Sequence, residues 1–223
     1  MEKKSATKSH KKEWGRAEAS EAFLDYVLTE GKLPVSVYAF TKLQGQQETD
    51  FYKLFNSFEH LENQIWKTWI HETIQLLEDD ASYQEYTVRE KLLAFYFTWM
   101  QKILAHRSYV MMRFSLSQVK EMPTFLRALK EVFESYIHEL IVEGKDTMEI
   151  ASRPYDQYYP KAFWAQFLMI HRFWMKDMSK DFEDTDALIE KSVRFGLDMI
   201  AKGPIDSFQD LAKFLFHHKD LVR

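Results

Sequence analysis

Histidine is the residue type in this chain best suited to metal chemistry, and the spacing of its eight histidines does not fit a metal site. Helical metal centres are commonly built from Glu-x-x-His pairs, because residues three positions apart lie on one face of a helix. No histidine here has Asp or Glu three residues before it, and neither His71 nor His138 continues into a His-Glu-x-x-His motif. His217 and His218 are adjacent, so they would point to different sides of a helix. We expect no metal and no cofactor.

Motifs for hydrolytic or nucleotide-dependent catalysis are also missing from the sequence. The chain has no cysteine, which excludes a thiol nucleophile, a disulfide and a cysteine-ligated metal. It has no glycine-rich phosphate loop and no Gly-x-Ser-x-Gly nucleophile elbow. We therefore expect that the protein is not an enzyme.

The composition favours an all-α fold. The 223 residues include only 6 Gly and 5 Pro, too few for the many tight turns of a β-rich protein, and 46% are hydrophobic, enough for a large core. The spacing of the apolar residues predicts three short helices followed by five or six longer ones. The expected helices span 17–30, 35–43, 47–54, 58–77, 87–105, 107–116, 122–142, 159–178 and 184–201, with a connection at 143–154 and a terminal piece at 205–217.

The N-terminal residues and the hydropathy predict a soluble, cytoplasmic protein. The opening segment, MEKKSATKSHKKEWGR, is basic and polar and has no apolar run behind it, unlike a signal peptide. No apolar stretch approaches the roughly 20 residues that a membrane span needs. Residues 1–16 carry six Lys or Arg against two Glu, a net charge of +4 in a chain of net charge −4. We expect a flexible basic arm there, either solvated or in contact with phosphates.

Residues 46–55, QQETDFYKLF, follow an isolated glycine and have the spacing of the second half of a helix-turn-helix. Such a motif joins two short helices through a turn of three to four residues, where glycine readily supplies the left-handed backbone. Gly45 lies between the expected helices at 35–43 and 47–54. The sequence therefore predicts a helix-turn-helix, although an ordinary three-helix packing unit remains an alternative.

The continuation of this stretch, FYKLFNSFEHL at residues 51–61, resembles the aromatic-Tyr-x-x-Phe-x-Ser-Lys-Glu-x-Leu signature of the tetracycline-repressor-like (TetR) family. Working backwards, Gly45 aligns with the family's turn glycine and Phe40 with its buried isoleucine. Ser36 and Val37 align with the start of its second helix, and Gly31 with the glycine that closes the first. The motif covers about residues 22–61, and beyond it the resemblance is one of helical layout.

The resemblance implies an all-α, TetR-like fold in three parts. These are the arm at 1–16, a helix-turn-helix DNA-binding-like domain at 17–57, and a helical effector-binding and dimerisation domain at 58–223. Double-stranded DNA would be the partner of the first domain. The residues expected to contact it are Ser36, Gln46, Gln47, Thr49, Tyr52 and Lys53.

Several residues depart from the family pattern. The usual Ala-Gly-Val turn is Gln44-Gly45-Gln46 here, and the basic residue after the serine, expected to contact phosphate, is Phe58. Glu48 and Asp50 occupy the recognition helix, where carboxylates repel phosphates. Residues 35–62 carry two Lys against four Asp or Glu. This net charge of −2 is a poor electrostatic match for DNA and puts in doubt whether the motif still binds it.

The C-terminal two-thirds of the chain is rich in aromatic residues and methionine. Its helices are apolar on more than one face, which the family layout explains by a ligand cavity on one side and a dimer interface on another; a plain close-packed core is the alternative. We expect an apolar or lipid-like effector there. The expected pocket residues are Phe95, Trp99, Met100, Met111, Phe114, Phe133, Trp164, Phe167 and His171.

The last two long helices are the expected dimerisation elements, because the family forms a four-helix bundle from them across a two-fold axis. The apolar residues expected at this homodimer interface are Phe163, Ile170, Trp174, Leu188, Ile189, Val193, Leu197 and Ile200. Burial of all of them within one chain is the alternative.

Taken with the resemblance, the sequence predicts a ligand-responsive transcriptional regulator, a repressor, that binds DNA as a homodimer and a hydrophobic effector in its C-terminal domain. The alternative is a lipid- or isoprenoid-binding accessory protein that kept the fold and lost DNA binding.

Overall fold

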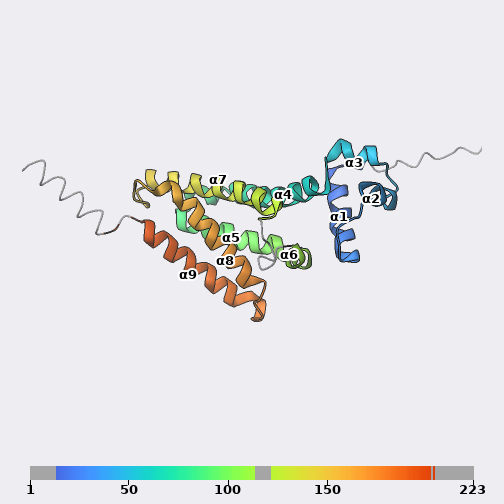
Figure 1. Ribbon diagram of the computed structural model, residues 1–223. Helices are drawn as coiled ribbons and strands as arrows, with labels where there is room; N and C mark the ends of the chain where they lie inside the picture. Colours follow the sequence, from blue (N-terminus) through green and yellow to red (C-terminus); the bar gives the residue numbers. More distant parts are fainter. Residues whose placement is uncertain (1–13, 114–121, 202, 204–223) are drawn as a thin grey trace, which may run out of the picture. The chain divides into compact units, whose positions relative to one another are not determined.

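The computed structural model describes residues 14–113, 122–201 and 203, and the regular elements within these ranges are helices, as expected (Figure 1). The α-helices are α1 (Arg16–Glu30), α2 (Val37–Leu43), α3 (Glu48–Leu54), α4 (Phe58–Glu78), α5 (Val88–Leu104), α6 (Arg107–Arg113), α7 (Thr124–Asp146), α8 (Tyr159–Trp174) and α9 (Glu183–Ile200). Short 3₁₀ helices η1 (Ala81–Glu85), η3 (Asp156–Tyr158) and η4 (Lys180–Phe182) lie between them. The chain forms two compact units, residues 1–65 and 66–223, so that the boundary lies within α4.

The three short helices of the first unit end at the expected residues 30, 43 and 54, and they begin within two residues of the expected starts. Gly31 closes α1 with a left-handed backbone (φ 66°), and its N–H donates to the Val27 carbonyl. The Ser36 hydroxyl caps α2 by accepting from the N–H of Ala39 at 3.1 Å. Gly45 has φ 64° in the turn between α2 and α3, which is the conformation that a helix-turn-helix asks of this position.

Four phenylalanine rings form the core of this unit. Phe58 stacks on Phe23 at 5.7 Å and meets the edges of Phe40 and Phe51 at 5.4 and 5.2 Å. Each of α1, α2, α3 and α4 contributes one of these rings, so the cluster fixes the angles between the helices. Phe58, the residue that replaces a basic side chain of the family pattern, therefore has a packing role.

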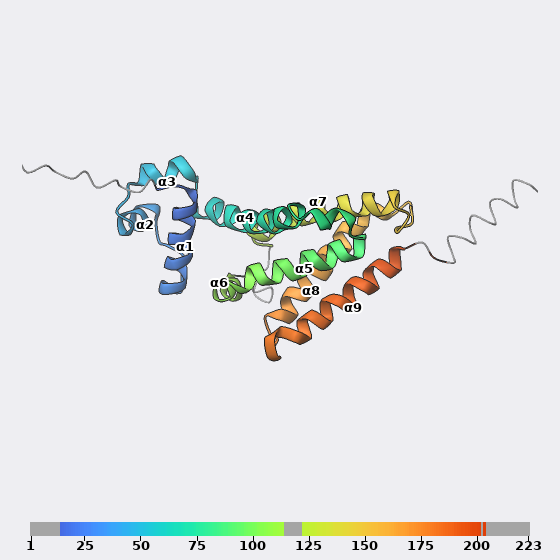
Figure 2. The same cartoon turned by 180° about the vertical axis from the view of Figure 1, so that it is seen from behind.

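In the second unit, α5, α7 and α8 surround an aromatic core, and α9 runs beside α8 in both views of the ribbon (Figures 1 and 2). Residues of α4 also belong to this unit: Trp66 stacks on Phe125 at 4.9 Å, and Trp69 stacks on His106 at 4.3 Å. The end of α9 is tied to the segment after α7, because the N–H of Ala151 donates to the Ile200 carbonyl at 3.0 Å.

Two helix ends differ from the expectation. α7 continues through residues 143–146, which the sequence suggested as a connection, and ends at Asp146; Thr147 caps it, and its N–H donates to the Glu143 carbonyl. α8 ends at Trp174 rather than at 178, and the Arg107 side chain donates to the carbonyls of Trp174 and Met175. The expected terminal piece at 205–217 and residues 114–116 lie outside the described residues.

No helix in the part of the chain that the structure describes is long and apolar enough to cross a membrane. Within the same residues, no group of three His, Cys, Asp or Glu side chains could hold a metal ion.

Candidate functional site

The residues predicted to contact DNA lie at the accessible surface of the first unit. Gln47, Thr49, Tyr52 and Lys53 are exposed and Gln46 is half-buried, whereas Phe51 on the same helix is fully buried. Thr49, Tyr52 and Lys53 share one face of α3, because positions three and four apart are neighbours on a helix. Ser36 stands at the start of α2. The predicted residues thus lie on α3, in the turn before it and at the N-cap of α2.

Asp50, one of the two acidic residues of α3, makes contacts within its own helix. One carboxylate oxygen accepts from the N–H of Gln47 at 3.3 Å, and the other accepts from Lys53 Nζ at 2.9 Å. The first contact satisfies a backbone donor at the helix start, where a negative charge is also favoured by the helix dipole. Asp50 therefore has a local structural role, and its charge is partly balanced by Lys53.

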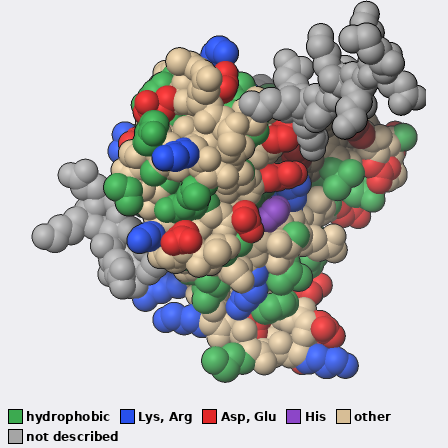
Figure 3. All heavy atoms as spheres, turned by 90° about the vertical axis from the view of Figure 1, so that its right-hand side faces the viewer, with side chains coloured by type: hydrophobic (Ala, Val, Ile, Leu, Met, Phe, Trp, Pro, Cys, Tyr) green, Lys and Arg blue, Asp and Glu red, His purple; other side chains and the backbone are tan. Residues whose placement is uncertain are grey.

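Glu48 differs from Asp50 in its surroundings. Its side chain is exposed, and among the described residues no hydrogen bond or ion pair holds it. The face of the molecule in Figure 3 shows basic, acidic and hydrophobic side chains interspersed, with no uniformly basic patch formed by described residues. Most of the basic arm, residues 1–13, lies outside the described residues; Arg16 belongs to α1, and its guanidinium lies 5.4 Å from the centre of the Phe55 ring.

Six of the residues predicted to line a ligand pocket are in contact with one another in the core of the second unit. Phe133 lies 5.6 Å from Phe95, 5.9 Å from Trp164 and 4.5 Å from Phe167, measured between ring centres. Phe167 in turn lies 5.9 Å from Trp99 and 4.0 Å from His171. All six are buried, so this aromatic cluster would have to open before it could admit an effector.

The polar member of this cluster, His171, is fully buried and hydrogen-bonded at both ring nitrogens. The indole N–H of Trp99 lies 2.6 Å from Nε2, and Nδ1 lies 2.6 Å from the Phe167 carbonyl. Since the indole can only donate, Nε2 accepts and Nδ1 carries the proton that is donated to the carbonyl. Burial lowers the pKa of His171 from 6.5 to about 4, so the imidazole is neutral at pH 7.

The remaining pocket candidates are not part of this cluster of rings. Met100 is buried on α5, Met111 is exposed on α6, and Phe114 lies outside the described residues. His106 stacks on Trp69, and its pKa is lowered by burial and by the nearby Lys102 charge.

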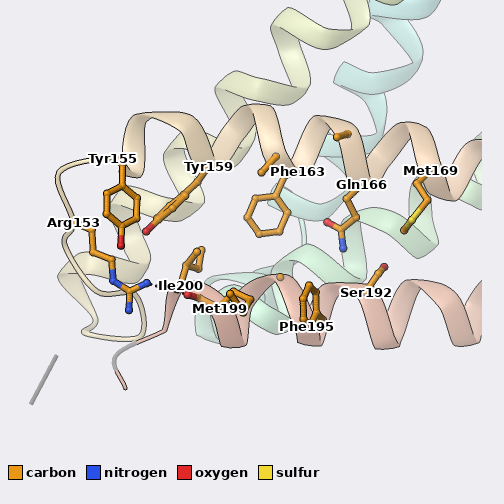
Figure 4. A pocket seen from close by; sticks show the side chains of 13 residues that line it. Arg153, Tyr155, Tyr159, Phe163, Gln166, Met169, Ser192, Phe195, Met199 and Ile200 are labelled. Carbon is orange, nitrogen blue, oxygen red and sulfur yellow. Dashed lines mark hydrogen bonds between the residues drawn. The ribbon is translucent and has the colours of Figure 1, made fainter. Parts of the chain in front are cut away.

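A groove of about 660 Å³ opens between α8 and α9 (Figure 4). One wall is formed by Tyr159, Phe163, Gln166 and Met169 of α8, and the facing wall by residues of α9. The α9 residues and those at the end of the groove are Ser192, Phe195, Gly196, Met199, Ile200, Arg153 and Tyr155. Phe195 and Met199 are 68% and 61% exposed, which is unusual for large apolar side chains on adjacent turns of one helix.

The residues predicted at a dimer interface face the interior of the chain. Leu188 is half-buried, and the others are buried: Phe163, Ile170, Trp174, Ile189, Val193, Leu197 and Ile200. This is the burial within one chain that the sequence left open as an alternative. The exposed apolar residues of the same two helices are Met169, Phe173, Phe195 and Met199.

The α8–α9 groove was not anticipated from the sequence. A signal for its α9 wall is present, because Phe195 and Met199 are spaced four apart and fall outside the stripe formed by Ile189, Val193 and Leu197. A second apolar stripe on a helix indicates a second contact surface. Arg153 and Tyr155, which lie in the segment before α8, could not have been assigned to the groove from spacing alone.

Comparison with known proteins agrees with this architecture. The sequence model of the family described as "Tetracyclin repressor-like, C-terminal domain" matches residues 91–215, more than half of the chain. The protein belongs to the tetracycline-repressor-like family. The fold and the regulator class that the helix-turn-helix residues indicated are thereby established, although the family model matches the C-terminal region and the motif lies in the first unit.

Solved structures share the fold at low sequence identity. The fatty acid degradation regulator FadR from Bacillus halodurans is 16% identical with a TM-score of 0.60, covering 86% of this chain and 97% of that one. A protein assigned to the tetR family of transcription regulators from Shewanella sp. PV-4 is 15% identical with a TM-score of 0.58, covering 84% and 98%. A protein of unknown function from Rhodococcus sp. RHA1 is 13% identical with a TM-score of 0.56, covering 84% and 95%. No curated protein matches the sequence.

Proposed function

We propose that this TetR-like protein is a transcriptional repressor that binds double-stranded DNA as a homodimer and releases it when a hydrophobic effector binds. The observation that carries the proposal is that α3 has one buried side and one exposed side. Phe51 is buried in the core of the helix-turn-helix unit, while Thr49, Tyr52 and Lys53 are presented to solvent. A recognition helix needs this arrangement, because its buried side sets the angle of the helix and its exposed side contacts bases and phosphates.

The acidic residues of α3 weaken this proposal less than their number suggests. Asp50 is engaged by Lys53 and by the backbone of its own helix, so Glu48 remains as the main source of repulsion toward phosphates. We assign phosphate contacts to Lys53, to the Ser36 hydroxyl and to the basic arm at residues 1–16. Gln46, Gln47, Thr49 and Tyr52 would contact base edges or sugar atoms.

For the homodimer, the exposed residues Met169, Phe173, Phe195 and Met199 supply an apolar surface on α8 and α9. Isologous dimers bury the same surface of both copies, and an apolar surface of this kind is what such contacts use. The buried residues that the sequence predicts there, such as Val193 and Leu197, would support this surface from within the chain. An effector that changes the pairing of the two copies would alter the spacing of the two helix-turn-helix units through α4.

The test is equilibrium binding of a fluorescently labelled duplex, measured by anisotropy at a series of salt concentrations that starts at low ionic strength. The proposal predicts binding whose logarithm falls linearly with the logarithm of the salt concentration. Lys53→Ala should lower the affinity and reduce that slope by about 0.9, the value for one lost phosphate contact. Lys180→Ala, an exposed lysine in the other unit, is the matched control and should leave both unchanged.

A second candidate function is a lipid- or isoprenoid-binding protein that has kept the fold and lost DNA binding. The exposed Glu48 favours it, as does the packing of the half-buried Phe58 against core rings, where the family pattern has a phosphate-binding basic residue. The same titration separates the two functions. Absence of salt-dependent binding to any duplex at low ionic strength would rule out the repressor.

A further inference from the structure

Two consecutive residues in the α8–α9 link, residues 175–182, have a left-handed backbone. Asp181 has φ 52° and ψ 21°, and Phe182, the N-cap of α9, has φ 64° and ψ 29°. Residues other than glycine seldom adopt this region, and those that do are mostly single Asn or Asp residues. A bulky residue such as Phe182 is an outlier there, and such strain persists only where the surrounding structure holds it.

The Arg107 guanidinium, at the start of α6, holds the Phe182 ring in place. It lies 4.7 Å from the centre of the Phe182 ring and 4.3 Å from the centre of the Trp174 ring. Both of its terminal nitrogens also donate to the Trp174 carbonyl at 3.3 Å. A guanidinium can stack on rings and donate hydrogen bonds in its own plane at the same time. Arg107 therefore connects α6 to the end of α8 and to the residue that precedes α9.

A second set of contacts caps the first turn of α9. One oxygen of the Asp177 carboxylate accepts from the backbone N–H and the hydroxyl of Thr185, at 2.9 and 2.5 Å. The other oxygen accepts from the N–H and the hydroxyl of Ser179, and the Ser179 hydroxyl accepts from the N–H of Asp184 at 3.1 Å. These bonds satisfy backbone donors that a helix start leaves unpaired. Their geometry depends on the path of residues 180–182, which lie between the capping side chains and α9.

The strained backbone and the Arg107 contacts are of similar size in free energy. A left-handed residue other than glycine and a cation–π contact each amount to about 1–2 kcal/mol. The link can therefore have two conformations of similar free energy, one held by Arg107 and one with a relaxed backbone. A segment with two such arrangements can transmit a small displacement from one helix to another.

We propose that Arg107, Trp174 and Phe182 form a latch that couples the position of α6 to the start of α9. With α6 in place, Arg107 holds Phe182 against Trp174, and the backbone at 181–182 stays left-handed. When the start of α6 moves away, this backbone returns to the right-handed region and the caps on the first turn of α9 break. The latch goes beyond the proposed function, because it requires neither an effector nor a duplex.

The experiment measures the strain by comparing glycine with alanine at residue 181. Asp181 is exposed, and no hydrogen bond or ion pair holds its side chain among the described residues, so the two variants differ mainly in backbone preference. The folding equilibrium constant is measured by urea unfolding at one fixed protein concentration, because self-association would add to it. Asp181→Gly should exceed Asp181→Ala about fivefold, which is about 1 kcal/mol, because glycine adopts the left-handed region freely.

The same pair of variants is then measured in an Arg107→Ala background. Without the guanidinium the link relaxes, so the ratio of glycine to alanine should fall to one or below, since glycine loses more entropy on folding. Met148 provides the matched control, because it is also left-handed (φ 64°) and exposed but lies after α7. Its ratio of glycine to alanine should be the same in both backgrounds. A residue that only contributes packing energy would lower the stability of every variant equally and leave both ratios unchanged.

The response of α9 is measured by amide hydrogen exchange of Asp184 and Thr185, whose N–H groups are capped by Ser179 and Asp177. Exchange of these two amides should be at least tenfold faster in Arg107→Ala than in the parent, because breaking the caps exposes them. Phe182→Leu is the second variant, which serves if Arg107→Ala does not unfold cooperatively. It removes the ring under the guanidinium, leaves α6 unchanged and should lower the ratio at residue 181 in the same way.

Three results would overturn the latch. A fivefold ratio at residue 181 that persists without Arg107 would show that the link stays left-handed without α6. A ratio near one in the parent would show that the backbone carries no strain. Unchanged exchange of Asp184 and Thr185 would show that α9 does not respond. The duplex titration that tests the repressor is independent of all three.

Discussion

The neutral, buried state of His171 makes a quantitative prediction about stability and pH. The pKa of this group is about 4 in the folded protein, against 6.5 for an unperturbed histidine, which we take for the unfolded chain. Between pH 7 and pH 5 the unfolded chain therefore takes up a proton at this position, whereas the folded protein stays largely neutral there. The unfolding free energy must fall as the pH is lowered through this range.

The magnitude follows from the two pKa values. At pH 5 the unfolded histidine is almost fully protonated and the folded one almost fully neutral, so His171 alone should lower the unfolding free energy by about 2 kcal/mol relative to pH 7. The pKa of His106 is also lowered, so this residue should further decrease the unfolding free energy as the pH falls. The assay is reversible urea unfolding followed by circular dichroism at pH 7 and pH 5.

His171→Gln isolates the contribution of this residue, since an amide can accept from Trp99 and donate to the Phe167 carbonyl but does not titrate. The variant should be less stable at pH 7 because of the altered packing, yet lose about 2 kcal/mol less on going to pH 5. Trp99→Phe removes the indole donor but keeps the buried imidazole, so it should retain the pH dependence. A His171→Gln variant with the full pH dependence of the parent would refute the assignment.

Two further substitutions test how the second unit is held together, each by urea unfolding at pH 7. Arg107→Lys should lower the unfolding free energy by about 1–3 kcal/mol. The guanidinium donates to the Trp174 carbonyl at the end of α8 and lies 4.3 Å from the centre of the Trp174 ring, and an ammonium cannot make both contacts. Unchanged stability would contradict this role. Gly144→Ala should destabilise by about 1–2 kcal/mol although alanine favours helices, because the new Cβ would lie 2.7 Å from Ile150 Cδ1. Combining it with Ile150→Val should restore part of the loss, and a stabilising Gly144→Ala would show that Ile150 moves aside.

The helix-turn-helix unit was largely predictable because its features are local. Gly31 and Gly45 need a left-handed backbone, and Ser36 needs to cap the next helix, so each residue type directly indicates its conformation. The role of Phe58 was not predictable, because the family pattern marked it as a lost phosphate contact. Only the positions of Phe23, Phe40 and Phe51 in space show that its ring completes a core.

The effector side was harder to predict for a related reason. Periodicity identifies which residues of a helix are apolar, but it does not say whether they meet each other, a ligand or a second chain. Phe133 and Phe167, which are predicted pocket residues, contact each other, and Val193 and Leu197, which are predicted dimer residues, are buried within the chain; both assignments stay predictions. Arg153 joins the groove through a connection whose path depends on the end of α9.

The way Asp50 is bound within α3 also limits how this protein could be redesigned. Replacing an acidic residue by a basic one is the obvious way to raise the affinity of a recognition helix for nucleic acid. At Asp50 that change would remove both the acceptor for the Gln47 N–H and the partner of Lys53. The added positive charge would therefore come with a less stable first turn of α3. Glu48 carries no such constraint among the described residues, which makes it the position where an engineer, or natural variation, could change sequence preference with a single substitution.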